Sequence, residues 1–311
     1  MTAPFPSRPS EVKAWCIAHD FHPNRTLGQN FLIDRNTIDG ILAAADVHPS
    51  DKVLEVGPGM GALTHALLDA KAEVTAIEKD PRLAELLRES CAEEKSLSLT
   101  TADMLDIDLD RLLSTGEALF KKDVVDSGSH PTTPYFGIFL SNLPYSVGTR
   151  ILLEICRHPL APACCIVMVQ KEVADRLAAK PSTPNRGQAG VWIQQNYDVE
   201  PMHVVKPTCF WPKPEIASTV VRLTRHDRLP LTPAERKDFE TITKTAFMHR
   251  RKQMASTFRQ ASALTGLANE EDILSWLDSA HLDPKIRPEA ITNEEWIVLA
   301  RALPSFRKEA R

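Results

Sequence analysis

The sequence predicts an α/β protein whose parallel sheet is covered by helices, followed by a smaller domain made only of helices. From residue 52 onward, short apolar runs alternate with amphipathic stretches, the pattern of strands that alternate with helices in a parallel sheet. After residue 226 the apolar period becomes purely helical. A chain of 311 residues is long enough for two domains, so we expect one at 1–226 and another at 227–311.

The expected strands of the first domain are short apolar runs, most of them followed by a helical pattern. They lie at 52–56, 72–77, 97–101, 135–142, 163–169 and 217–225, and a further β-rich run follows Tyr197. Helices are expected from about Met60, from Pro81, through Ile151 and Ile155, and from about Glu172. The helical patterns of the second domain cover 234–247, 251–260, 270–278 and 293–303. Residues 121–134 contain Gly, Ser and Pro without any period, which predicts a surface loop.

Composition is that of an ordinary globular protein and excludes several chemistries. No run approaches the roughly 20 apolar residues of a membrane-spanning helix, and the first ten residues lack the apolar core of a signal peptide, so we expect a cytoplasmic protein. The 6 cysteines form no CxxC pair and no histidine stands at zinc spacing, so no metal is expected. The motifs of metalloproteases, serine hydrolases and P-loop NTPases are missing. The net charge of −4 gives no overall attraction to nucleic acid.

A glycine-rich turn after the first strand suits a nucleotide-like ligand. Gly57, Gly59 and Gly61 lie between an apolar run and a helical pattern, where missing side chains let a ligand approach the backbone. With Ala62 the turn also fits the GxGxxA dinucleotide fingerprint, and Glu78 lies where a ribose-binding acid belongs. An NAD enzyme is therefore one interpretation, although nothing in the sequence supplies a hydride-transfer site.

Acidic residues at three consecutive strand ends favour a cationic ligand instead. Glu55 precedes the glycines, Glu78 ends the next strand, and Asp103 follows the third. A carboxylate near the glycines repels a pyrophosphate and attracts a cation. S-adenosylmethionine carries a sulfonium and an ammonium and no phosphate, so it is the expected cofactor.

The tetrapeptide Asn142-Leu143-Pro144-Tyr145 follows the fourth strand, at the edge where open α/β sheets bind ligands. The lone pair of an exocyclic amine on a base is delocalised into the ring, which makes it a poor nucleophile. The Asn142 side-chain oxygen and the Leu143 carbonyl could accept from the amine hydrogens and stabilise the positive charge that grows on nitrogen. Tyr145 can stack on the flat base. This placement predicts methyl transfer to a base amine.

Seven segments together resemble one family, the adenine dimethyltransferases of small-subunit ribosomal RNA. They are LGQNFL at 27–32, EVGPGMGALT at 55–64, AIEKD at 76–80, ADML at 102–105, NLPY at 142–145, QKEVADRL at 170–177 and FWPKPEIAS at 210–218. The resemblance runs from about residue 24 to 302 and includes FMHRRK and LDPKIRPEAITNEEW in the helical part. It implies a Rossmann-like S-adenosylmethionine-dependent methyltransferase sheet with a small helical domain, and dimethylation of two adjacent adenines in a ribosomal RNA hairpin.

Matched by motif, the resemblance also implies roles for single residues. Glu78 would take the ribose hydroxyls, Asp103 would accept from the adenine amine of the donor, and Asn142 would serve both donor and target. Phe210 would lie beside the target base as a sandwich partner for Tyr145, or else be a buried anchor of its loop. The residues expected at the donor are Gln29, Asn30, Leu32, Glu55, Gly57, Gly59, Glu78, Lys79, Asp103, Met104 and Asn142.

Three departures from the family pattern concern positioning rather than chemistry. The loop at 121–134 is longer than usual, and NRGQAGVW at 185–192 replaces a tyrosine-glycine stretch. Gly148 stands where a polar residue is common. None of the three removes a motif that the chemistry needs.

A local basic segment explains how an acidic chain could bind RNA. It contains Lys244, His249, Arg250, Arg251, Lys252 and Arg259 without one acidic residue. Phosphate contacts require such a local patch and not a positive whole protein, although a charge run is more often a solvated helix face. Lys206, Lys213 and Arg186 are candidates to extend the patch.

The predicted function is dimethylation of the N6 amines of two adenines in small-subunit ribosomal RNA during ribosome assembly, by a monomer without membrane contact. The nearest rival is a large-subunit RNA methyltransferase of the antibiotic-resistance type, which shares every donor motif. A rival of another class is a non-catalytic assembly or transcription factor on the same scaffold. The helical tail and FWPKPEIAS favour the small-subunit enzyme, and the intact Asn142 and Asp103 motifs argue against an idle factor.

Overall fold

The computed structural model describes residues 6, 8–24, 29–123 and 132–307. Within them the chain divides into two compact units, one from Met1–Ala174 with Asp198–Arg225, the other from Asp175–Tyr197 with His226–Arg311. Most of the predicted loop at 121–134 lies outside the described residues. Its first residues form a short 3₁₀ helix, η3 (Lys121–Asp123).

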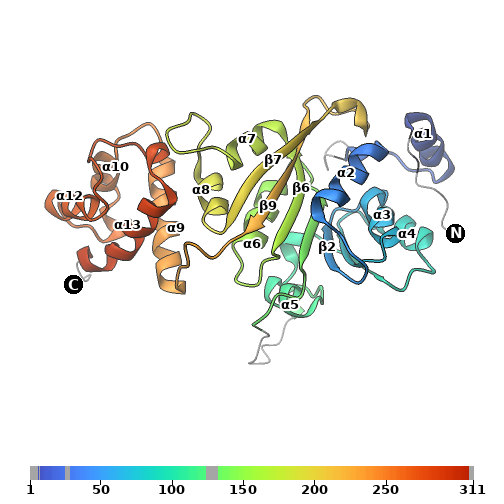
Figure 1. The fold of residues 1–311 in the computed structure, drawn as a ribbon, viewed down its shortest axis with the longest axis horizontal. Helices are drawn as coiled ribbons and strands as arrows, with labels where there is room; N and C mark the ends of the chain where they lie inside the picture. Colours follow the sequence, from blue (N-terminus) through green and yellow to red (C-terminus); the bar gives the residue numbers. More distant parts are fainter. Residues whose placement is uncertain (1–5, 7, 25–28, 124–131, 308–311) are drawn as a thin grey trace. The chain divides into compact units, whose positions relative to one another are not determined.

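The first unit is built on a seven-stranded sheet that is mostly parallel (Figure 1). The strand order is β4 (Leu97–Thr101), β3 (Glu73–Glu78), β2 (Lys52–Val56), β5 (Ile138–Asn142), β6 (Cys164–Gln170), β9 (Ser218–Arg225) and β7 (Tyr197–Val205). Strands β2 to β6 pair in parallel, and β9 runs antiparallel to β6. The predicted α/β class and its strands are confirmed.

The strand order places a ligand site between β2 and β5. From β2 the chain continues outward to β3 and β4, and then returns to the other side of β2 to form β5. The chain reverses direction across the sheet at this point, which leaves a crevice at the carboxyl ends of the two strands. Glu55 and the glycine turn follow one of these strands, and Asn142 ends the other.

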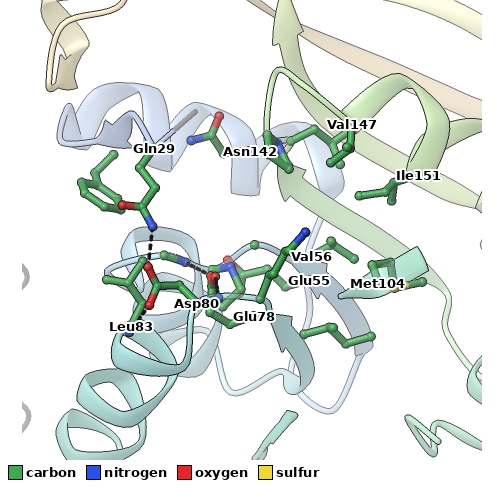
Figure 2. A pocket seen from close by; sticks show the side chains of 18 of the residues that line it. Gln29, Glu55, Val56, Glu78, Asp80, Leu83, Met104, Asn142, Val147 and Ile151 are labelled. Atoms are coloured by element: carbon green, nitrogen blue, oxygen red, sulfur yellow. Dashed lines mark hydrogen bonds between the residues drawn. The ribbon is translucent and has the colours of Figure 1, made fainter. Parts of the chain in front are cut away.

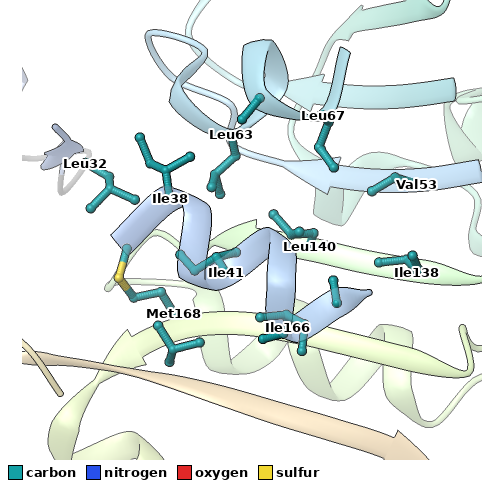
Figure 3. Packing of buried hydrophobic residues seen from close by; sticks show 14 of the residues in the cluster. Leu32, Ile38, Ile41, Val53, Leu63, Leu67, Ile138, Leu140, Ile166 and Met168 are labelled. Atoms are coloured by element: carbon teal, nitrogen blue, oxygen red, sulfur yellow. The ribbon is translucent and has the colours of Figure 1, made fainter. Parts of the chain in front are cut away.

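One face of the sheet packs against α2 (Arg35–Ala45) and α3 (Ala62–Asp69). In Figure 3, Ile41 of α2 lies beside Leu140 and Ile166 of the strands, and Ile38 lies farther along the helix, near Leu63. Because side chains alternate along a strand, Leu54 and Phe139 point to the opposite face, and both are fully buried. Both faces are therefore covered. The other helices of this unit are α1 (Pro9–Ala18), α4 (Pro81–Ser90), α5 (Leu109–Thr115), η2 (Met104–Asp106), η4 (Pro207–Cys209), α6 (Gly148–Cys156) and most of α7 (Lys171–Leu177).

The N-terminal segment adds structure that the sequence analysis did not predict. Helix α2 has a clear signal, since Asp34 caps it by accepting from the Thr37 backbone and the apolar Ile38 and Ile41 follow at helical spacing. Helix α1 is anchored by Val12, which lies in a cluster with Phe31. A two-stranded sheet joins β1 (Phe31–Leu32) to β8 (Phe210–Trp211) and holds this segment to the unit.

The second unit is helical, with a core around two fully buried tryptophans, Trp276 and Trp296. Its helices are α8 (Gln188–Gln194), α9 (Pro233–Met248), α10 (Met254–Gln260), α11 (Ser262–Thr265), α12 (Glu270–Asp278), η5 (Pro288–Ala290) and α13 (Asn293–Phe306). Thr232 and Thr292 begin α9 and α13 with capping boxes.

The division into units differs from the predicted boundary in one segment. The predicted first domain included residues 175–197, but these residues group with the helical unit. The indole of Trp192 donates to the Thr243 hydroxyl at 2.8 Å, and the Asn293 amide donates to the Val191 carbonyl at 2.9 Å. These contacts join residues far apart in sequence, which is why the periodicity did not indicate them.

Candidate active site

A pocket opens at the carboxyl edge of β2, β3, β4 and β5, at the predicted crevice (Figure 2). The empty space at this edge is about 1110 Å³ when the open solvent at the mouth of the pocket is included. The pocket brings together all but one of the residues predicted for the donor and the chemistry. These are Gln29, Asn30, Leu32, Glu55, Gly57, Gly59, Glu78, Lys79, Asp103, Met104, Asn142, Leu143, Pro144 and Tyr145.

The glycine turn adopts the backbone conformation that its sequence requires. Gly57, Gly59 and Gly61 have φ values of 70°, 59° and 89°, in the left-handed region that side chains disfavour. A Cβ atom on Gly59 would lie 3.2 Å from the Phe31 ring, and one on Gly61 would lie 2.6 Å from Leu87. The turn therefore forms an open cradle against the pocket, and larger residues would strain it.

Glu55 is a buried carboxyl group under this cradle. Its side chain is 1% exposed and accepts a hydrogen bond from the Thr64 hydroxyl of α3 at 2.7 Å. Burial raises the pKa of Glu55 to about 8, the Thr64 hydrogen bond lowers it, and the nearby Glu78 raises it further. The group is mainly protonated at neutral pH, and a cation in the pocket would favour its ionised form.

Glu78 ends β3 with its carboxylate fixed by backbone groups. Its Oε2 accepts from the Gly59 N–H at 2.9 Å, and its Oε1 accepts from the Asp80 N–H at 2.8 Å. Burial raises the pKa of Glu78, while these backbone hydrogen bonds lower it. Each carboxylate oxygen can accept a second hydrogen bond, so the group can still bind two neighbouring hydroxyls.

Asp103 follows β4 and carries a full negative charge at the pocket wall. Its Oδ2 lies 2.7 Å from the Lys79 ammonium, and its Oδ1 accepts from the Leu105 N–H at 2.9 Å. Partial burial acts to raise the pKa of Asp103, but the hydrogen bonds from Lys79 and Leu105 outweigh it and lower the pKa. Met104 is buried beside it and supplies an apolar surface to the same pocket.

Asn142 ends β5 with its amide in a defined orientation. The amide nitrogen donates to the Asn30 carbonyl at 3.2 Å. Within the residues that the structure describes, the side-chain oxygen of Asn142 receives no hydrogen bond. The oxygen is therefore available to a ligand in the pocket.

The turn after Asn142 leaves a second acceptor available. The Pro144 carbonyl accepts from the Gly148 N–H at 2.7 Å, whereas the Leu143 carbonyl receives no backbone hydrogen bond in the described part of the chain. A Cβ atom at position 148 would lie 2.8 Å from the Cβ of Leu143. Glycine at 148, the departure noted above, thus allows α6 to begin directly against the turn.

Tyr145 and Phe210 have different environments. Tyr145 lines the pocket, and its phenol oxygen lies 2.7 Å from the Ser218 hydroxyl; burial raises the pKa of this phenol, and the Ser218 contact lowers it. Phe210 is 2% exposed, pairs with Leu32 between β1 and β8, and belongs to the core cluster. The structure does not bring Phe210 to the pocket lining, and its position matches the buried anchor considered above.

Asp80 is a residue of this site that sequence reasoning missed. Its Oδ1 caps α4 by accepting from the Arg82 and Leu83 backbones. Its Oδ2 accepts from the Gln29 amide at 2.7 Å, a contact drawn in Figure 2. The hydrogen bond between Gln29 and Asp80 joins the segment that carries Asn30 to the end of β3. The proximity of Asp80 to Glu78 was the only available signal.

The predicted basic patch lies in the second unit, on α9, α10 and the turn between them. Lys244, His249, Arg251, Lys252 and Arg259 are exposed, and Arg250 is partly exposed and donates to the Pro184 carbonyl. Arg259 forms an ion pair with Glu270 at 2.6 Å. Lys244 and Arg251 form no ion pair with any described residue.

The expectation that Arg186 extends this surface is wrong. Its side chain is 1% exposed and donates to the Ala179 carbonyl at 2.9 Å, to the Gln194 side-chain oxygen at 2.8 Å and to the Asn293 side-chain oxygen at 2.6 Å. Lys206 and Lys213 are exposed, as a surface role requires.

Among the described residues, no group of three or more His, Cys, Asp or Glu side chains is placed to hold a metal ion. No helix in that part of the chain is long and apolar enough to cross a membrane.

The chain is similar to known proteins over most of its length. The family model described as ribosomal RNA adenine dimethylase matches residues 20–274. A curated relative, ribosomal RNA small subunit methyltransferase A of Lactiplantibacillus plantarum, is 35% identical over 299 residues, covering 96% of this chain and 95% of the relative.

Two solved structures share the fold. A dimethyladenosine transferase from Plasmodium falciparum has a TM-score of 0.67 at 21% identity, covering 86% of this chain and 95% of that one. The 23S rRNA methyltransferase ErmE has a TM-score of 0.60 at 25% identity, covering 88% of this chain and 100% of that one. The family model spans most of the sequence and the curated relative nearly all of it, so the chain belongs to the ribosomal RNA adenine dimethylase family.

Proposed function

We propose that this protein transfers methyl groups from S-adenosylmethionine to the N6 amines of two adjacent adenines in a small-subunit ribosomal RNA hairpin. The observation that carries the proposal is the hydrogen bonding of Asn142, a residue of the pocket lining: its amide nitrogen is held by the Asn30 carbonyl, while its side-chain oxygen has no protein donor among the described residues. The family and the small-subunit relative support the substrate class.

The residues of the pocket fit S-adenosylmethionine. The glycine cradle has no side chain to obstruct a close approach, and Glu55, Glu78 and Asp103 supply carboxyl groups around it. Two of these carboxyl groups have a raised pKa and would be stabilised in their ionised form by a cation. When bound, this group supplies an electrophilic methyl on a sulfonium. Glu78 has acceptor capacity for the ribose hydroxyls, and Asp103 for the adenine amine.

The turn at 142–145 would prepare the acceptor amine. The Asn142 oxygen and the Leu143 carbonyl would accept from its two hydrogens and hold its lone pair directed at the methyl group. Both acceptors also stabilise the positive charge that develops on nitrogen in the transition state. Tyr145 would stack on the base after it leaves its helix. The amine proton needs no strong base, because the cationic product amine is acidic enough to lose it to water or a carbonyl.

The rival functions are less well supported. A large-subunit enzyme of the resistance type shares the fold, as the ErmE structure indicates, but the near full-length relative at 35% identity is a small-subunit enzyme. A non-catalytic factor would have no need for two available acceptors at the pocket.

The experiment that tests the proposal is mass spectrometry of ribosomal RNA. Small subunits that lack these methyl groups are incubated with the protein and labelled S-adenosylmethionine, and the RNA is digested to nucleosides and fragments. We expect two methyl groups on each of two adjacent adenines in small-subunit RNA. Label in large-subunit RNA, on another base, or on no base would contradict the proposal.

The basic patch provides a second, independent prediction about RNA. Replacing Arg250, Arg251 and Lys252 together by alanine should weaken RNA binding and flatten its salt dependence, because each lost phosphate contact reduces the slope of log K against log salt by about 0.7 to 0.9. The measurement is RNA affinity between low and physiological salt. We expect the slope to fall by about 2 for the triple variant.

A matched triple variant controls for the change in net charge. Lys13, Lys71 and Lys95 are exposed cations of the first unit, and replacing them by alanine removes the same charge elsewhere. An equal change of slope in both triple variants would show that the patch is a solvated helix face.

A further inference from the structure

Tyr145 is tied at its phenol end to a different strand from the one that carries it. It follows β5 by the short turn after Asn142, and its oxygen lies 2.7 Å from the hydroxyl of Ser218, the first residue of β9. Strand β6 lies between β5 and β9, and Ser218 pairs in register with Gln170 at the end of β6. The contact therefore spans the edge of the sheet at which β5 and β6 end and the antiparallel β9 begins.

Ser218 is in a rigid position. Its side chain is fully buried, and the adjacent backbone is fixed because the Ala217 carbonyl accepts from the Lys171 N–H at 3.0 Å. Tyr145, in contrast, is partly buried at the pocket mouth, on a turn. A tether from a buried strand to the far end of an aromatic ring fixes where that end lies, and it therefore restricts rotation about the Cα–Cβ bond, which would swing the ring away.

We infer that Ser218 is a positioning residue for methyl transfer, which fixes the position of the Tyr145 ring through the hydroxyl pair. The inference rests on the proposed function, in which the target base stacks on this ring. The acceptor amine must lie in line with the methyl group, and small errors in its placement are costly to rate. A ring that can swing about its Cα–Cβ bond still contacts the base but no longer holds it in one position. Loss of the contact between Tyr145 and Ser218 should therefore lower kcat and leave the affinity for the donor unchanged.

The prediction takes the form of a double-mutant cycle. Tyr145→Phe keeps the ring and removes the phenol oxygen, and Ser218→Ala removes the other hydroxyl. Because both changes break one contact, we expect each single variant and the double variant to lose the same factor in kcat, about tenfold. The KM for S-adenosylmethionine and its Kd should stay within about twofold of the wild-type values, because no donor contact is assigned to either hydroxyl.

Thr219→Val is the matched control. Thr219 is the next residue of β9, is 4% exposed, and its hydroxyl has no hydrogen-bond partner in the described residues. Its replacement by the similarly shaped valine removes a buried strand hydroxyl of the same kind without touching Tyr145. We expect its kcat to match the wild type. Thermal melting of all the variants identifies any that fail to fold, and Tyr145→Phe tests the contact from its partly exposed side.

The outcomes separate the inference from the function on which it rests. Equal losses in the two single variants and the double variant, with donor affinity unchanged, support the tether. Additive losses, unchanged kcat in either single variant, or a loss of donor affinity in parallel with kcat would each overturn it. If the wild-type protein transfers no methyl group to small-subunit RNA, the proposed function fails and the inference fails with it.

Discussion

Asn142→Ala should lose at least about a hundredfold in kcat while it keeps most of its affinity for S-adenosylmethionine, by analogy with the loss of one preorganised hydrogen-bonding group at a transition state. The side-chain oxygen is one of only two acceptors that we assign to the target amine. The amine hydrogens become more acidic as charge develops on nitrogen, so the hydrogen bond is worth more in the transition state than in the bound ground state. Such an effect lowers kcat and leaves binding largely unchanged.

The measurement combines methyl transfer to assembling small subunits with calorimetric titration of the donor. Asn142 also donates to the Asn30 carbonyl, so the alanine variant loses one contact to the segment next to the donor. We expect that loss to weaken donor binding by no more than about tenfold. Turnover near the wild-type rate would exclude Asn142 from the chemistry, and a donor Kd raised as much as kcat falls would make it a binding residue only.

The parts of the site that the sequence could predict are those that depend on strand ends. Glu55, Glu78, Asp103 and Asn142 each follow an apolar run, and parallel strands bring their carboxyl ends to one edge. The glycine turn was predictable for the same local reason, since its positive φ values require glycine. Local pattern and sheet topology together were sufficient for the pocket.

The contacts that hold these residues in place could not be predicted in this way. Gln29 meets Asp80, and Tyr145 meets Ser218, through chain segments that are 51 and 73 residues apart. No periodicity indicates such pairs, because each depends on how loops close over the sheet. Arg186 was expected on the surface, but the structure buries it. A cation in a Pro-rich and Gly-rich stretch suggests a surface, yet backbone and amide oxygens from three parts of the helical unit bury it.

Phe210 shows the limit of transferring a role by motif. The motif is present, but β8 pairs with β1 and places the ring in the core beside Leu32. The short strand pairing was not visible in the sequence, because each strand has only two residues. A residue between prolines can be exposed or buried. For Phe210, the pairing of β8 with β1 decides that the ring is buried.

Glu55→Gln should make the protein more stable than the wild type at alkaline pH, with no such gain near pH 4. The folded-state pKa of Glu55 is about 8, above its usual value of 4.5, so the native protein binds the proton more tightly than the unfolded chain does. The contribution of Glu55 to wild-type stability is therefore fully present below pH 4.5, falls as the pH rises towards 8, and levels off above it. A shift of this size corresponds to several kcal/mol at about 1.4 kcal/mol per pKa unit.

Glutamine isolates this contribution because it has the same shape and can still accept from Thr64. Glu78 also has a raised pKa and interacts with Glu55, so the difference between the unfolding free energies of the two proteins reports on Glu55 together with that interaction. Urea unfolding from pH 5 to 9 makes the measurement, and parallel curves would mean that Glu55 is ionised in the folded protein.

The same proton should couple stability to donor binding. A cationic donor favours the ionised carboxyl, so wild-type affinity for S-adenosylmethionine should rise as the pH rises towards about 8, with proton release, while the glutamine variant should lack this contribution. Titration in buffers of different ionisation enthalpy counts the protons released. If both proteins release the same number at pH 7, Glu55 does not sense the donor. If the wild type releases more protons, Glu55 is the source of the difference. The ionisation of Glu55, which costs stability in the ligand-free protein, is then favoured by the bound donor.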